Sequence, residues 1–293
     1  MTDRPPDHRL ADEATLTGRT IAVTAERKSE EQAKLFRRRG ATVLHAPTMH
    51  TVDLRHDVDL RRRTDALLTS PPDWTLATTG FGMRLWFEAA DTWGIGDELA
   101  AALASSTVVA RGPKAQSACR QRGLEVAWTA PRESMPEVVE WLRARPGIER
   151  SRVAVQLFDP EDHPSTADVR SFTREVEEIS IYRWRRPLDP APAISLAHDI
   201  ASGRVDAVTF TSQPAIRFLV EIAEEAGVLE AMVAAFNDGS VLPVCVGPVC
   251  AEAGADAGIT TMVWPEPFRL APMVRLAEEL LSGDRGRAGP ASR

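Results

Sequence analysis

The chain contains few cysteines, and their spacing matches neither a disulfide framework nor a zinc site. Its 293 residues include only Cys119, Cys245 and Cys250, and no two of them form a Cys-x-x-Cys pair. The six histidines are scattered, and none has a neighbouring carboxylate at metal-ligand spacing. The sequence therefore predicts no metal site.

Long apolar runs and a positive net charge are also absent. No stretch approaches the length of a membrane span, and the polar N-terminus has no signal-peptide core. The formal net charge of -7 argues against a general nucleic-acid surface, and the basic triplets at residues 37–39 and 61–63 are typical of solvated helix ends. We therefore expect a cytoplasmic protein that binds neither nucleic acid nor a membrane.

One pattern, a short apolar strand followed by hydroxyl residues and a helix, occurs twice. Thr211 and Ser212 lie between such a strand and such a helix, and Thr78 and Thr79 stand at the matching point of the first half. Gly-Pro pairs that begin a helix also recur, in residues 112–123 and 247–258, and each segment ends on a glycine. Apolar residues make up 43% of the chain, which is enough for a core in each copy. The sequence therefore predicts two copies of one α/β unit.

The remaining segments predict the ends and the connections. Residues 1–16 and 284–293 are polar or rich in glycine, arginine and proline, so we expect a disordered arm and a disordered tail. Residues 158–164 are acidic and proline-rich and predict a loop. Residues 176–185 alternate in polarity and predict one long extended strand, and residues 260–263 predict a further short strand.

Several short motifs, taken in their order and spacing, resemble those of the uroporphyrinogen-III synthase family. They are IAVTAER from residue 21, Ala46-Pro47, ATTG from 77, GPKA from 112, ISIYRW from 179, VTFTSQPA from 208 and VGPVCAEA from 246. The resemblance is to an actinobacterial branch whose members can carry an additional C-terminal winged-helix domain, and we expect this chain to be a member without one.

The resemblance implies an α/β fold of two flavodoxin-like parallel-sheet domains joined by a two-stranded β-ladder hinge. Domain 1 would be discontinuous and consist of residues 17–47 and 186–283. Domain 2 would span residues 48–185, with hinge strands at residues 48–52 and 179–185.

The family's reaction is a cofactor-independent loss of water in tetrapyrrole and heme biosynthesis. Such a hydro-lyase closes the linear polycarboxylate hydroxymethylbilane to uroporphyrinogen III and inverts the last pyrrole ring. The resemblance therefore implies a tetrapyrrole substrate, no cofactor, and functional coupling to hydroxymethylbilane synthase.

Four helix starts are candidates for holding such a substrate, because the first turn of a helix presents unpaired N–H donors and a partial positive charge. The candidate substrate-binding residues are Thr78, Thr79, Gly80, Gly112, Pro113, Lys114, Thr211, Ser212, Gln213, Gly247, Pro248, Val249 and Cys250. The alternative is that the hydroxyl groups only cap their helices.

Tyr182 is the candidate catalytic residue. It is the only tyrosine in the chain, and it stands at the position of a tyrosine in the family's crossing segment. The resemblance implies that its phenol donates a hydrogen bond to the departing hydroxyl group. The alternative is an aromatic side chain that only packs in the hinge.

The sequence also departs from the family pattern. Members commonly have threonine just after the Gly-Pro-x start, whereas this chain has Ala115 and Cys250, and acidic residues at 159–162 replace a basic turn. These departures keep open a second function, a non-catalytic two-lobed sensor or regulatory protein for a tetrapyrrole or another anion. A nicotinamide site at Gly80-x-Gly82 is disfavoured, because Leu85 stands at the third glycine position.

Overall fold

The structure is a computed structural model that describes residues 14–157 and 164–283. It divides into two compact units, one comprising the described parts of Met1–His50 and Arg185–Arg293 and the other Thr51–Trp184. Each unit contains its own parallel sheet, and the strands β3 (His50–Asp53) and β9 (Tyr182–Arg185) form a separate two-stranded sheet where the chain passes between the units. The predicted α/β class, with two parallel-sheet domains and a two-stranded ladder, is confirmed.

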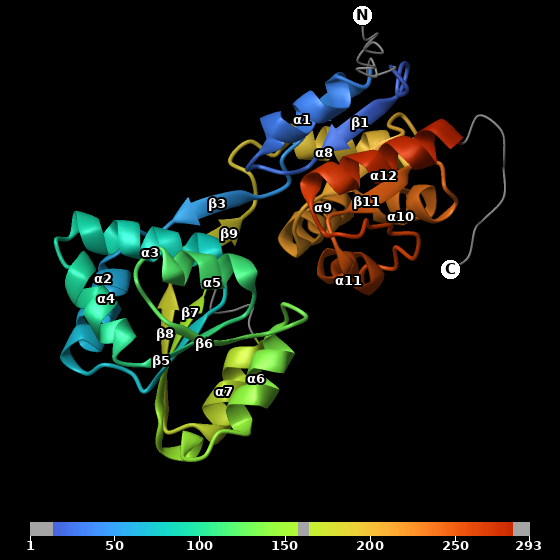
Figure 1. Cartoon of the computed structure of the whole chain (residues 1–293). Helices are drawn as coiled ribbons and strands as arrows, with labels where there is room; N and C mark the ends of the chain where they lie inside the picture. Colours follow the sequence, from blue (N-terminus) through green and yellow to red (C-terminus); the bar gives the residue numbers. More distant parts are fainter. Residues whose placement is uncertain (1–13, 158–163, 284–293) are drawn as a thin grey trace, which may run out of the picture. The chain divides into compact units, whose positions relative to one another are not determined.

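In the first unit the strand order is β11-β10-β1-β2, and all neighbouring strands are parallel. These strands are β1 (Thr20–Val23), β2 (Thr42–His45), β10 (Ala207–Phe210) and β11 (Leu242–Cys245). Helices α1 (Ser29–Arg37) and α12 (Leu270–Gly283) cover one face, where Phe36 and Met273 pack against Ile21 (Figure 1). Helices α8 (Ala191–Ala201), α9 (Gln213–Glu225) and α10 (Leu229–Asn237) lie on the opposite face, and α11 (Pro248–Asp256) packs against α9.

In the second unit the strand order is β6-β5-β4-β7-β8, again with parallel neighbours. These strands are β4 (Trp74–Ala77), β5 (Thr107–Ala110), β6 (Val126–Thr129), β7 (Arg152–Leu157) and β8 (Glu175–Ser180). Four of the five strands repeat the order found in the first unit, as the internal duplication predicts.

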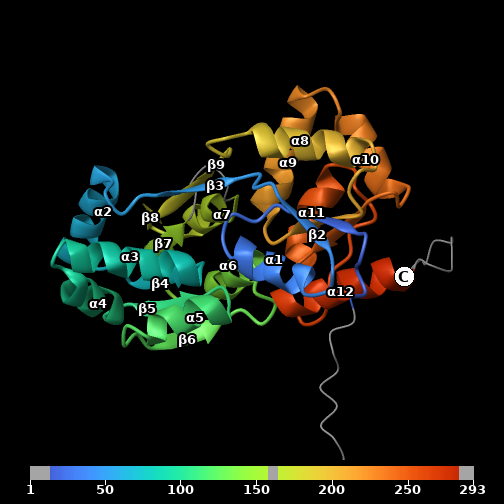
Figure 2. The ribbon, with the colours of Figure 1, turned by 90° about the horizontal axis from the view of Figure 1, so that it is seen from above.

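Side chains that alternate along these strands build a core on each face of the second sheet. Leu76 and Val155 pack with α6 (Met135–Arg143) and α7 (Pro164–Phe172) on one face. Ala77 and Ala154 belong to the core on the other face. The helices there are α2 (Val58–Thr69), α3 (Gly80–Thr92), α4 (Gly96–Ala104) and α5 (Pro113–Arg120), which Figure 2 shows gathered together. A short 3-10 turn, Ile148–Arg150, precedes β7.

Residues 176–185 do not form the single strand that their alternation predicts. β8 pairs with β7, whereas β9 pairs with β3. Ile181 lies between them and changes partners, because its N–H donates to the Leu157 carbonyl while its own carbonyl accepts from the Leu54 N–H. The ladder strands are therefore residues 50–53 and 182–185, where we expected 48–52 and 179–185.

Two further expectations differ from the structure. Residues 260–263 form no strand, since only Val263 bridges to Val244 and the chain then turns away toward Pro265. Leu16, expected to end a disordered arm, is fully buried in the core of the first unit, and its N–H donates to the Arg39 carbonyl. The rest of the expected arm up to residue 13, the tail at 284–293 and the acidic turn at 159–162 lie outside the described residues.

Within the two described ranges, no helix is both long enough and apolar enough to cross a membrane.

Candidate functional site

In Thr51–Trp184, the starts of α3 and α5 lie side by side at the carboxyl ends of the neighbouring strands β4 and β5. A Cβ atom on Gly80 would collide with the backbone carbonyl of Lys114, so glycine is what allows the two helix starts to approach this closely. The structure therefore brings the predicted Thr79-Gly80 and Gly112-Pro113-Lys114 segments together. Lys114 is exposed at this edge.

The two threonine hydroxyl groups at the start of α3 are already used by the fold. Thr78 is buried and donates a hydrogen bond of 2.6 Å to the Gln156 carbonyl. Thr79 is the N-cap of α3, and its Oγ1 accepts from the Gly82 N–H at 3.0 Å. The capping interpretation therefore applies to Thr79, and the substrate donors that remain at this point are backbone groups.

Gln156 is a structural partner that the sequence analysis missed. It lies at the end of β7, and its Oε1 accepts from the Thr79 N–H at 3.0 Å. In the sequence it is visible only as a single polar residue in the apolar stretch VAVQL. In the structure every residue of this strand is buried. Gln156 ties the end of β7 to the start of α3.

Tyr182 lies beside the α3 start. Only 3% of the residue is exposed, and its ring makes edge contacts with Phe81 and Trp184 at centroid distances of 5.0 and 5.8 Å. The phenol donates to Thr79 Oγ1 at 3.4 Å, which is longer than an ordinary O–H···O bond and therefore weak.

Arg111, which directly precedes Gly112, is the charged residue of this region that the sequence analysis did not select. Its pKa is lowered because the guanidinium is withdrawn from water, an effect that the Glu133 carboxylate partly offsets. The available signal was an arginine that ends an apolar strand just before a Gly-Pro helix start.

In the other unit, α9 and α11 begin at the carboxyl ends of the neighbouring strands β10 and β11. Their N-cap residues, Ser212 and Gly247, provide no side-chain cap to the helix N–H groups, and the Ser212 hydroxyl instead lies 3.5 Å from Met49 Sδ. Gln213 Nε2 is 3.5 Å from Glu252 Oε2, so a side chain of α9 reaches α11. Thr211 is half-buried next to this pair of helix starts.

The side chains of the Gly247-Pro248-Val249-Cys250 start offer little to a ligand. Cys250 is buried, and both its contact with the Cys245 thiol and its burial raise the pKa of the Cys250 thiol. Val249 is 48% exposed but apolar. The backbone N–H groups are therefore the polar groups that this start can present.

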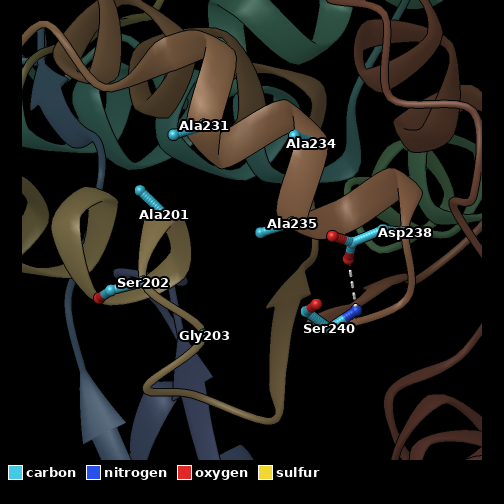
Figure 3. Close-up of a pocket in the computed structure, with 8 residues that line it drawn as sticks. All are labelled: Ala201, Ser202, Gly203, Ala231, Ala234, Ala235, Asp238 and Ser240. Atoms are coloured by element: carbon cyan, nitrogen blue, oxygen red, sulfur yellow. Dashed lines mark hydrogen bonds between the residues drawn. The ribbon is translucent and has the colours of Figure 1, made fainter.

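Two hollows among the described residues lie away from these helix starts. A hollow of about 340 Å³ lies in the first unit, near the N-terminal ends of β10 and β11. It is lined by Ala201, Ser202, Gly203, Ala231, Ala234, Ala235, Asp238 and Ser240 (Figure 3). Two of its polar side chains are already paired, since Ser202 donates to the His198 carbonyl and Asp238 accepts from the Ser240 N–H. A hollow of about 80 Å³ in the second unit is lined by Leu54, Asp57, Asp59, Leu60, Arg63, Glu178, Ser180 and Arg183. Neither includes a predicted site residue.

This chain is similar to one protein family and to several known proteins. Residues 30–275 match the family model HEM4, described as Uroporphyrinogen-III synthase HemD. An uncharacterized protein of Bacillus subtilis (strain 168), YjjA, is 26% identical over 271 residues, which cover 88% of this chain and 94% of that protein. A mutant uroporphyrinogen III synthase of Thermus thermophilus, in its Form-1 crystal, is 25% identical with a TM-score of 0.76 and covers 91% of this chain and 100% of its own. The wild-type Thermus enzyme in its Form-2 crystal, also 25% identical, gives a TM-score of 0.62 over 92% of this chain and 100% of its own.

Proposed function

Since the chain belongs to the uroporphyrinogen-III synthase family, we propose that it is a cofactor-independent hydro-lyase that converts hydroxymethylbilane to uroporphyrinogen III. The reaction removes water and closes the ring with the last pyrrole inverted. The match of the family over residues 30–275 carries this proposal. Its two-domain α/β fold matches that of a uroporphyrinogen III synthase from Thermus thermophilus, which supports the same assignment.

The helix starts suit the chemistry of this substrate. Electron-rich pyrroles provide the driving force for loss of water, so the protein mainly has to hold the linear chain in the geometry that closes the inverted ring. A polycarboxylate is held well by the first-turn N–H groups of helices. The helices α5, α9 and α11 begin without a side-chain cap, so N–H groups of their first turns are available for substrate carboxylates, apart from the proline nitrogens and the Cys250 N–H, which donates to the Gly247 carbonyl.

In this proposal Tyr182 assists the departure of the hydroxyl group. A hydrogen bond from the phenol stabilises the charge that develops on the leaving oxygen. The present bond to Thr79 Oγ1 is long, at 3.4 Å, and therefore weak. Hydroxymethylbilane synthase would supply the substrate.

The second candidate function is a non-catalytic sensor for a tetrapyrrole or another anion. The observation that favours it is the loss of two hydroxyl donors, because Ala115 and Cys250 stand where the family commonly has threonine. Ala115 is buried, and the Cys250 thiol contacts Cys245 inside the unit. With fewer hydroxyl donors, such a site is less able to stabilise the departing hydroxyl group.

A coupled assay separates the two functions. Hydroxymethylbilane is generated by hydroxymethylbilane synthase in the presence of the chain, without added metal or nucleotide, and the oxidised products are separated by chromatography. Formation of the type III isomer supports the enzyme. Tight binding of a tetrapyrrole with only the type I isomer formed supports the sensor, and neither binding nor type III product rejects both.

A further inference from the structure

The side chain of Gln156 holds the start of α3 in a fixed orientation. Its Oε1 accepts from the Thr79 N–H at 3.0 Å, and its Nε2 donates to the Leu157 carbonyl at 3.0 Å. These two partners set the orientation of the amide, because a flipped amide would face a donor with a donor and an acceptor with an acceptor. Gln156 is fully buried, so its oxygen stays directed at Thr79.

Glycine at position 82 makes room for this amide. A Cβ atom there would lie 2.2 Å from Gln156 Nε2 and 2.8 Å from Thr79 Oγ1. Glycine is a poor helix former, so its presence in the first turn of α3 is explained by this close approach and not by helix formation. The Gly80-x-Gly82 pattern therefore serves packing, since Gly80 admits the Lys114 carbonyl and Gly82 admits Gln156.

The Thr79 hydroxyl group joins Gln156 to Tyr182. Its Oγ1 accepts from the Gly82 N–H at 3.0 Å and from the Tyr182 phenol at 3.4 Å, and it donates to Gln156 Oε1 at 3.4 Å. The direction of the bonds follows from chemistry, because an amide oxygen can only accept and a backbone N–H can only donate. Thr79 therefore directs its single hydroxyl proton at Gln156 and offers a lone pair to Tyr182.

The Thr79 hydroxyl can turn toward the phenol oxygen without leaving a buried group unpaired. Gln156 Oε1 keeps the Thr79 N–H, its shortest bond, and Thr79 Oγ1 keeps the Gly82 N–H. The two bonds that the turn changes are both 3.4 Å long and therefore weak. The hydroxyl can thus accept from the phenol, or donate to it when the phenol directs its own O–H elsewhere.

We infer that Gln156 and Thr79 are positioning residues for Tyr182. They hold the phenol as a donor directed at Thr79, and when the phenol donates instead to the departing hydroxyl group of the substrate, Thr79 turns and donates to the phenol oxygen. The second hydrogen bond strengthens the first, because a hydroxyl group that accepts a hydrogen bond becomes a better donor. This inference rests on the proposed function, since it adds the residues that support Tyr182 there.

The chain has a single tyrosine, which gives a direct readout of this arrangement. Protein labelled with tyrosine that carries carbon-13 at Cζ gives one NMR signal, and its position without substrate reports the hydrogen bonding of the phenol. The variants are Gln156→Met, which removes the amide, Thr79→Val, which removes the hydroxyl group, and Thr79→Ser, which keeps it. The second readout is KM and kcat for hydroxymethylbilane in the coupled assay.

Gln32→Met is the matched control. Gln32 is also a buried glutamine, and its Nε2 donates to Thr209 Oγ1 at 2.7 Å. This variant therefore removes a buried glutamine–threonine hydrogen bond outside Thr51–Trp184, the unit that contains Gln156 and nearly all of its partners. Melting temperatures of all variants show whether each remains folded.

We expect the Tyr182 signal to move in the same direction in Gln156→Met and Thr79→Val, because in both the phenol no longer donates to a fixed Thr79 oxygen. Thr79→Ser and Gln32→Met should leave the signal close to its wild-type position. We also expect Gln156→Met and Thr79→Val to lower kcat by about three- to tenfold with little change in KM, which is the size of effect of one neutral hydrogen bond. Thr79→Ser should recover most of this loss, and Gln156→Met should cause no further loss in a Tyr182→Phe background.

The inference is overturned if the Tyr182 signal is the same in Gln156→Met and the wild type, or if it moves equally in Gln32→Met. It is also overturned if the loss of kcat persists in the Tyr182→Phe background. If Gln156→Met does not fold, equal signals in Thr79→Val and Thr79→Ser overturn it. A chain that forms no type III isomer rejects the proposed function alone, and the NMR signal then still decides whether Gln156 and Thr79 hold the phenol.

Discussion

Among single residues, Tyr182 is the one whose substitution tests how far the reaction depends on a side chain. Tyr182→Phe removes the hydroxyl group that reaches Thr79 and keeps the ring contacts with Phe81 and Trp184. General-acid assistance is typically worth about 10²–10⁴-fold, and pyrrole-assisted loss of water needs little of it, so we expect kcat to fall by about 10²-fold or less. Steady-state kinetics with product analysis checks this, and the isomer formed should stay the same. Complete loss of type III product, with an unchanged melting temperature, would show that the tyrosine is central.

The sequence predicted the place of the candidate residues in the fold better than it predicted their hydrogen-bond partners. Thr78 and Thr79 were selected because hydroxyl residues follow a strand, and they do lie at a helix start. Their hydroxyl groups nevertheless serve Gln156 and Gly82, because a local pattern does not reveal a partner that is far away along the chain.

At the scale of helices, a charge placed at the start of α5 tests whether backbone N–H groups hold the substrate. Gly112 has extended backbone angles, at φ -168, which any residue adopts, and the exposed Glu133 side chain, 3.1 Å from where a Cβ would stand, must shift slightly in both variants. Asp and Asn are equally good N-caps, so Gly112→Asp and Gly112→Asn should have similar melting temperatures, while only the aspartate repels a substrate carboxylate. We expect kcat/KM to be lower in the aspartate variant by at least about tenfold. Equal kcat/KM values for the two variants would reject a role for the α5 start.

The same pair of substitutions applies to the start of α11. Gly247 is also extended, at φ -178, and a Cβ there would lie 3.2 Å from the Phe268 side chain, which must shift slightly in both variants. Gly247→Asp should lose more kcat/KM than Gly247→Asn, again by at least about tenfold. If Gly247→Asp retains near-normal rates while Tyr182→Phe abolishes type III product, catalysis depends on the tyrosine and not on the backbone donors.

Most helices and strands could be predicted from local pattern, and the exceptions have physical causes. The Gly-Pro starts at Gly112 and Gly247 gave the beginnings of α5 and α11 correctly, because proline fits the first helical turn. Alternation in residues 176–185 concealed a break at Ile181, because period-two alternation does not reveal which partner a strand pairs with. Helix α10 was not predicted, since LEAMVAAFN is too short to establish a helical period.

At the scale of the whole molecule, we expect a hinge, because the chain passes between the two units twice. The chain passes between the units only near β3 and β9. We predict that the units reorient as near-rigid bodies when a tetrapyrrole binds.

Small-angle scattering with and without uroporphyrin III checks this prediction. The expected result is a change in the radius of gyration on binding, while circular dichroism shows unchanged secondary structure. Scattering profiles that coincide in the presence and absence of a bound porphyrin would show that the linkers do not act as a hinge.

The duplication is the large-scale feature that the sequence revealed most clearly. Repeated turns at Thr78 and Thr211 indicated two related units, and the repeated strand order agrees. The discontinuous division of the chain came from the family resemblance alone, because strand patterns do not show that β1 pairs with β10 from the far end of the chain.

The isomer composition of the product, measured against the concentration of this chain, tests the proposed activity most directly. Without enzyme, hydroxymethylbilane closes to the type I isomer, so the two routes compete for one substrate. We predict that the type III fraction rises with the concentration of the chain until it accounts for nearly all product, with no metal or nucleotide added. A product that remains type I at every concentration, from a chain with a cooperative melting transition, would contradict uroporphyrinogen-III synthase activity.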